Sequence, residues 1–202
     1  MTGAGTGTDT LLATTRAAQS ARATTSVGMA IALGAIAMCF AALLLGYAIL
    51  RAQAASWPPP GEAAVPRSWS WLFGATLAAL AGSAAMRLAV RIDDGSAPGR
   101  LRSLLIATAL AGVTFIAVQI AGWLWLSYAG IRPSSGIVAS VVYALTLFHA
   151  LHALAGLIAL APLLLGALRK KAIGAAALGA VSSFWHLVTI AWLVVFVAVF
   201  VA

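Results

Sequence analysis

Residues 146–165, TLFHALHALAGLIALAPLLL, form an apolar run long enough to cross a membrane as one helix. His149 and His152 lie three positions apart in this run, so both side chains project from nearly the same face of the helix. Polar, ionisable side chains are costly in hydrocarbon and usually have a partner there. The run therefore raises two questions: how many such segments the chain contains, and what the histidines bind.

The composition answers the first question. Of the 202 residues, 63% are hydrophobic and only 8% are charged, whereas an average soluble domain has about 25% charged residues. These values predict an all-α protein that crosses the membrane five times. The predicted membrane domain covers residues 27–202, with spans at about 27–50, 68–90, 103–127, 137–166 and 177–201.

The positive charges predict the orientation of the chain. With five spans, nine of the twelve Lys and Arg residues fall on the side of the N-terminus and three on the other side. Because cytoplasmic loops are enriched in basic residues, we expect a cytoplasmic N-terminus and an external C-terminus. We expect residues 1–26 to form a flexible cytoplasmic tail and the bacterial plasma membrane to be the location. The basic residues stand at segment ends without interleaved aromatic residues, which argues against nucleic acid as a partner.

Few polar side chains lie inside the predicted spans, and none of them is acidic. Among the polar positions at depth are Gln119, the two histidines of the fourth span, and Ser182, Ser183 and His186 in the fifth. All four Asp and Glu residues fall in the tail or in loops. Proton pumps and ion-coupled transporters use titratable relays within the membrane, so this composition does not indicate such an activity.

Two interpretations of the histidines remain open at this stage. His152 and His186 fall at similar depth in consecutive antiparallel spans, so two imidazoles could bind a haem iron, and three histidines could bind zinc or copper. Alternatively, neutral histidines hydrogen-bond between helices and satisfy polar groups that lipid cannot. Residues 150–156 include three alanines and a glycine, which allow close packing and leave little room for a porphyrin. They favour the structural interpretation.

Other polar and aromatic residues have simpler explanations. Arg87 lies near the cytoplasmic end of the second span, where its guanidinium could reach the interface or bind a lipid phosphate. Trp185 and the other tryptophans of the last three spans are interpreted as packing or interface residues. Glycines within spans, at positions 112, 122 and 156, predict close approach between helices.

Four motifs in order resemble one protein family. They are WPPPG (57–61), RPSSG (132–136), FHALHALAGLIAL (148–160) and SFWHLVTIAWLVVFVAVF (183–200). Together they resemble subunit III of the haem–copper terminal oxidases, the cytochrome c oxidase family, in its five-helix bacterial type. The resemblance covers roughly residues 27–201.

This resemblance implies five helices grouped as two plus three around a lipid-filled cleft. It implies a subunit without a cofactor, which assists assembly and stability of the catalytic subunit I, where the haems and copper reside. Other oxidase subunits and phospholipids are the implied partners, and a respiratory supercomplex is a further one. The implied roles are structural: the three histidines join the fourth and fifth helices, and the interhelix or lipid-cleft candidates are His149, His152, Trp185, His186, Gln119 and Arg87.

The sequence also departs from the family pattern at positions where the family carries acids. Ile36, Gly122 and Thr189 stand at these places. Two alternatives to an oxidase subunit therefore stay in view: an accessory subunit of nitric oxide reductase, and a stand-alone membrane carrier that binds haem or metal through the three histidines.

Overall fold

The computed structural model describes the backbone of residues 5–62, 69–92 and 98–201. It describes side chains for residues 27–62, 71–92 and 98–201. The chain divides into two compact units, Met1–Ile36 and Ala37–Ala202. The first unit, where described, is the beginning of one helix, and everything below on packing concerns the second unit.

Five long helices make up the described chain, which contains no strand. They are α1 (Gly5–Gln53), α2 (Trp69–Ile92), α3 (Pro98–Tyr128), α4 (Ile137–Leu168) and α5 (Ala175–Phe196), with a short 3-10 turn at Pro133–Ser135 and a π-helical end at Val197–Val201. Each helix is long and apolar enough to cross a membrane. The predicted all-α class with five spans is confirmed.

The helix ends differ from the predicted spans at two places. Helix α3 starts at Pro98 rather than near 103, because Arg100 and Arg102 end the apolar run without ending the helix. Helix α1 starts at Gly5, so the backbone of residues 5–26 is helical where we expected a flexible tail. A helical backbone tests neither the mobility of this segment nor its side of the membrane, so both stay predictions.

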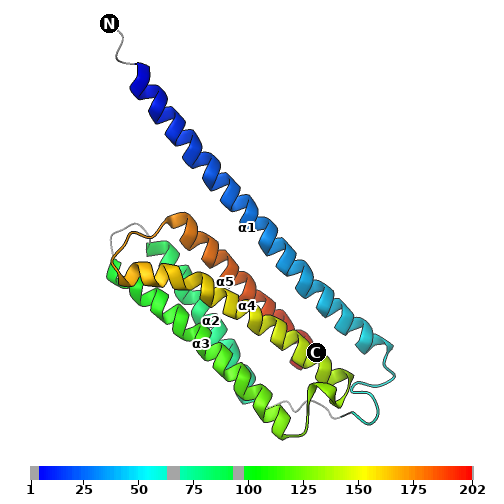
Figure 1. Cartoon of the computed structure of the whole chain (residues 1–202). Coiled ribbons are helices and arrows are strands. Elements are labelled where there is room, and N and C mark those ends of the chain that lie inside the picture. Colours follow the sequence, from blue (N-terminus) through cyan, green and yellow to red (C-terminus); the bar gives the residue numbers. More distant parts are fainter. Residues whose placement is uncertain (1–4, 63–68, 93–97, 202) are drawn as a thin grey trace. The chain divides into compact units, whose positions relative to one another are not determined.

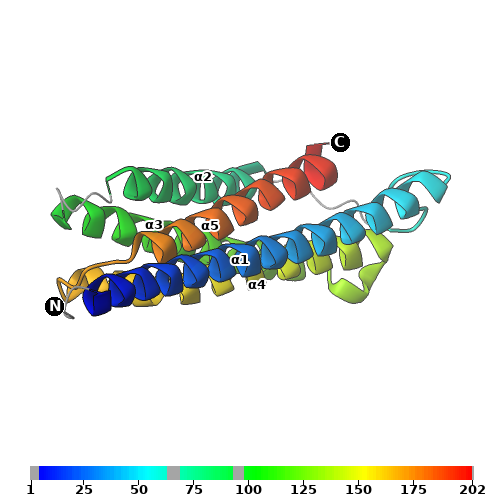
Figure 2. The ribbon, with the colours of Figure 1, turned by 90° about the horizontal axis from the view of Figure 1, so that it is seen from above.

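Helices α2 to α5 contact one another in a ring. Helix α2 packs along α3 and α5, and α4 packs along the same two helices, so α2 and α4 lie on opposite sides of this four-helix group (Figures 1 and 2). The most extensive contact joins α2 to α3. The two-plus-three grouping around a lipid-filled cleft stays an expectation from the resemblance.

Two aromatic side chains connect the second-unit part of α1, Ala37–Gln53, to the rest of that unit. Phe40 and Tyr47 are its only buried residues, and they lie seven positions apart on one face. The Phe40 ring contacts Phe148 of α4 edge-on, with ring centroids 4.9 Å apart. Tyr47 contacts Trp57 in the loop that follows, at 5.7 Å. Most of the other side chains of this segment are exposed.

Candidate functional site

A slot made of three glycines holds the indole of Trp185. A Cβ atom at Gly82 of α2 would lie 2.9 Å from the indole Nε1, and one at Gly112 of α3 would lie 2.7 Å from Cη2. A Cβ at Gly156 of α4 would be 3.2 Å from the same ring. Glycines on three helices thus leave the space that this α5 side chain fills. The predicted close approach at Gly112 and Gly156 is confirmed, and Gly122 packs equally tightly against Trp71.

His149 lies in an aromatic environment at the centre of the bundle. Its side chain is 1% exposed, and its ring centroid is 5.1 Å from that of Phe115 on α3 and 5.2 Å from that of Trp192 on α5. Its Nδ1 atom has no hydrogen-bond partner among the described residues. A buried, neutral imidazole between two aromatic rings packs like an aromatic side chain, and it brings α3, α4 and α5 together.

His152 lies closer to α1 and uses its polar edge locally. Its Nδ1 donates a hydrogen bond to the backbone carbonyl of Phe148, one turn earlier, at 2.8 Å. The ring contacts those of Phe148 and Phe40, with centroids 4.5 Å and 5.3 Å apart. Because Nδ1 is the donor, Nε2 is the acceptor nitrogen of the neutral ring. The hydrogen bond of this histidine therefore stays within α4, and its ring supports the contact between α4 and Phe40.

His186 forms a hydrogen-bonded connection between α5 and α2. Its Nδ1 lies 2.6 Å from Ser83 Oγ, and its Nε2 lies 3.3 Å from Ser182 Oγ one turn earlier on α5. A neutral imidazole donates through one nitrogen and accepts through the other, so both nitrogens have partners. The resemblance implied that this histidine joins α5 to α4, but its interhelix bond goes to α2.

Gln119 is fully buried on α3, and neither its Oε1 nor its Nε2 has a partner among the described residues. One turn before it, Phe115 faces His149, and one turn after it Trp123 donates to Thr146 Oγ1 at 3.0 Å. The antiparallel packing of α3 and α4 therefore places Gln119 at a level between His149 and Thr146. Arg87, by contrast, is exposed, one turn beyond Ser83 on α2.

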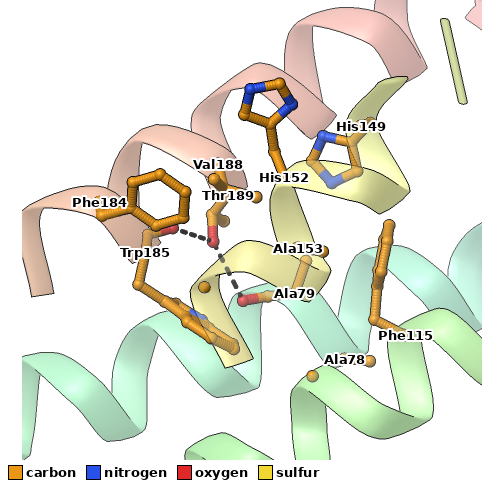
Figure 3. A pocket seen from close by; sticks show the side chains of 12 residues that line it. Ala78, Ala79, Phe115, His149, His152, Ala153, Phe184, Trp185, Val188 and Thr189 are labelled. Carbon is orange, nitrogen blue, oxygen red and sulfur yellow. Dashed lines mark hydrogen bonds between the residues drawn. The ribbon is translucent and has the colours of Figure 1, made fainter. Parts of the chain in front are cut away.

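A small cavity, the histidine pocket, lies beside His149 and His152 (Figure 3). Its volume is about 20 Å³, and apart from the two histidines and Thr189 its lining consists of glycine, alanine, valine and aromatic residues. In Figure 3 the two imidazoles point in different directions from α4. The hydroxyl of Thr189 does not bond to either imidazole there; it donates a hydrogen bond to the carbonyl of Trp185, at 3.0 Å. A space of this size is about that of one water molecule.

These residues do not fit a haem or a metal ion. The pocket is far too small for a porphyrin, and His186 already uses both ring nitrogens in hydrogen bonds to serines. The described part of the chain contains no group of three or more His, Cys, Asp or Glu residues placed to hold a metal. The described contacts of these side chains run between neighbouring helices, from His186 to Ser83 of α2 and from His149 to Phe115 of α3.

Sequence reasoning missed one polar contact, at the end of the bundle opposite to the α4–α5 connection. The carboxylate of Glu62 accepts hydrogen bonds from the backbone N–H groups of Ile137 and Val138, at 2.9 and 3.0 Å. Helix α4 begins after Gly136, which has no side chain to cap it, and Glu62 supplies the missing cap. The only hints in the sequence were this uncapped helix start and the single acid between the first two predicted spans.

The fold defines a multi-pass membrane protein built on a helix bundle. Comparison with known proteins narrows this class. The family model for cytochrome c oxidase subunit III matches residues 17–202. The chain belongs to the cytochrome c oxidase subunit III family.

Individual relatives agree with the family. A probable cytochrome c oxidase subunit 3 from Nocardia farcinica is 35% identical over 183 residues, covering 87% of this chain and 86% of that protein. A probable cytochrome c oxidase subunit 3 from Mycobacterium leprae is 33% identical over 182 residues with the same coverage. The cytochrome c oxidase subunit 3 of Thermostichus vulcanus is 25% identical over 184 residues, again covering 87% and 86%.

Proposed function

We propose that this chain is a non-catalytic subunit III of a respiratory haem–copper oxidase in a bacterial plasma membrane. It assists assembly and stability of the catalytic subunit, which holds the haems and copper. The family match supports membership of an oxidase complex. The observation that carries the structural role is that each histidine contacts groups of the packed helices: His149 contacts aromatic rings, His152 the carbonyl of Phe148, and His186 two serine hydroxyls.

The lipid around the helices determines which contacts hold them together. Helices in lipid gain little from burying apolar surface, so they associate through close packing and interhelical hydrogen bonds. The glycine slot around Trp185, the aromatic contacts of His149 and the bonds of His186 supply both. A bundle stabilised in this way keeps its outer surface in a fixed geometry, as a supporting subunit requires. Its outer surface is apolar, and phospholipids are the further partners that we propose.

The test is to tag this chain at one end, solubilise native membranes in mild detergent and isolate the tagged protein. Partners are identified by mass spectrometry, and a reduced-minus-oxidised spectrum is recorded. We expect haem bands together with a large multi-span catalytic subunit. The chain expressed alone should show no haem band.

Other outcomes separate the remaining alternatives. Haem that stays with the lone chain and disappears in His186→Ala would make it a haem carrier. Isolation together with a nitric oxide reductase would assign it to that enzyme. Either result would replace the proposal.

A further inference from the structure

A second and much larger cavity, the basic pocket, lies between the end of α2, the start of α3 and the connection from α4 to α5. Its volume is about 660 Å³, within the range of cavities that bind small molecules. The start of α3, the end of α4 and the start of α5 come together at this end of the four-helix group (Figure 1). The lining residues are Ile92, Pro98, Gly99, Leu101, Arg102, Ala167, Lys170, Lys171, Ala172, Ile173 and Ala175.

The lining is amphiphilic. Among the described residues that line the pocket, the charged ones are Arg102, Lys170 and Lys171, and all three are cationic. Apolar residues complete the wall, among them Leu101 and Ile173. A site that combines positive charge with apolar surface at the end of membrane spans matches a molecule with an anionic head and a hydrocarbon tail.

Lys170 has an unusual backbone conformation. After α4 ends, the N–H of Lys170 bonds to the carbonyl of Ala167 at 3.2 Å, and that of Lys171 bonds to Gly166 at 2.9 Å. This pair of bonds is the Schellman motif, whose left-handed residue is usually glycine. Here the residue is Lys170, with φ 55°. A side chain at this φ costs backbone strain that glycine would avoid. Compared with glycine, lysine at this position adds a positive charge at the pocket.

Two helix starts add positive potential to the pocket. Gly99 in the first turn of α3 and Ala175 at the start of α5 both line it, and α5 begins without a side-chain cap. The N–H groups of a first helical turn lack partners within the helix and favour anions. Arg91, Arg100 and Arg169 lie at the same end of the bundle but do not line the pocket. If only the excess of positive charge at this end mattered, the pocket-lining cations and these three would contribute equally to binding.

We propose that the basic pocket binds the phosphate of an anionic phospholipid, with Arg102, Lys170 and Lys171 around the headgroup. The acyl chains follow the apolar wall toward the membrane. This inference does not depend on the role of the chain in an oxidase, because it rests on this pocket alone.

The test uses the full chain purified in mild detergent with the subunits that it retains. Phosphatidylglycerol, phosphatidylcholine and inorganic phosphate are added separately at low ionic strength. Native mass spectrometry counts the retained lipid, and the midpoint of thermal unfolding reports stabilisation. We expect phosphatidylglycerol to be retained and to raise the midpoint, and neither phosphatidylcholine nor phosphate to do so.

Matched variants locate the site. R102Q/K170Q/K171Q should weaken phosphatidylglycerol binding on the order of 100-fold, since each cation near an anionic lipid contributes about fivefold. R91Q/R100Q/R169Q removes the same charge at the same end and should leave binding within about fivefold, one such contribution. K170G removes one cation while relieving the backbone, so binding should fall about fivefold without loss of thermal stability.

Several results would overturn the proposal. Equal loss of binding in both triple variants would show that only net charge matters. Equal stabilisation by inorganic phosphate would make the ligand a soluble anion. Asp93 and Asp94, outside the described residues, follow Ile92 in the sequence, so D93N/D94N is also measured. Unchanged or tighter binding in that variant agrees with the proposal, and loss of binding contradicts it.

Discussion

Helix α5 and the Ala37–Gln53 part of α1 use similar apolar residues in different ways. The membrane spans of the two helices have equal mean hydropathy. Yet α5 buries nine of its side chains within the four-helix group, including Trp185 and Trp192, whereas Ala37–Gln53 buries only Phe40 and Tyr47. Hydrophobicity brings both helices into the membrane. The shape and polar groups of their side chains decide which one packs.

The contrast follows from the solvent. Lipid is as apolar as leucine, so apolar residues gain little by leaving it for a helix interface. Helix α5 offers two indoles, a histidine and a hydroxyl group to glycines, a threonine, a serine and a backbone carbonyl on its neighbours. The α1 segment offers mainly aliphatic side chains, which lipid solvates equally well. The four experiments below test this difference, from the largest expected effect to the smallest.

Trp192→Ala should lower stability most. Trp192 is fully buried, and its Nε1 donates to Thr76 Oγ1 at 3.0 Å. Loss of its volume and this bond should cost about 3 kcal/mol, seen as a lower thermal midpoint of the purified complex. Trp125→Ala is the control, because Trp125 is 43% exposed. Equal effects of the two variants would show that tryptophan packing does not distinguish the bundle.

Gly112→Ala should be the next most damaging change. Its new methyl group would lie 2.7 Å from Trp185 and 2.8 Å from Leu157, and overpacking of this kind costs about 2 kcal/mol. Gly166→Ala, in α4, meets nothing within 4 Å and should be neutral or stabilising by up to about 1 kcal/mol through helix propensity. Thermal unfolding of both variants measures the difference. A stabilising Gly112→Ala would refute the glycine slot.

Glu62→Gln tests the connection between α4 and the loop that follows α1. The amide keeps one acceptor oxygen but loses the charge that favours a helix start, at a cost of about 1 kcal/mol. Hydrogen exchange at the Ile137 and Val138 amides should accelerate about fivefold for that loss, while exchange in α5 stays unchanged. Unaltered exchange at both amides would show that the carboxylate does not cap α4.

Phe40→Ala should have the smallest effect on the four-helix group. It removes the edge contact with Phe148, worth about 1 kcal/mol, and lipid can fill the vacated space. Chemical labelling of the thiol of Cys39, the exposed cysteine next to Phe40, should report altered accessibility of α1. The thermal midpoint should change little. Met38→Ala, at a position 73% exposed, is the control. A fall in midpoint as large as that of Trp192→Ala would remove the contrast between α1 and α5.

The spans could be predicted because their signal is local. About 20 consecutive apolar residues suffice to identify a membrane helix, and each of the five segments meets that requirement. The helical backbone of residues 5–26 could not be inferred in this way, because that segment is rich in Thr, Ala and Gly and carries no apolar run.

The partners within the site could not be predicted, because they are distant in the sequence. Glycines at positions 112 and 156 indicated close approach, but nothing in the sequence showed that Trp185 fills the space beside both. His186 pairs with Ser83, 103 positions away, and Glu62 caps α4 from 75 positions away. Residues that hydrogen-bond between helices have no characteristic spacing in the sequence that would identify them as partners.

The most direct test of the structural role of the histidines is the haem content of the purified complex in variants that remove them. His149→Phe, His152→Phe and His186→Gln are introduced singly, and haem and copper are measured per complex alongside the reduced-minus-oxidised spectrum. We expect unchanged haem and copper and a lower thermal midpoint, with the largest decrease for His149→Phe or His186→Gln. Loss of a haem or copper equivalent, from a complex whose subunits all remain, would make these histidines ligands and contradict their structural role.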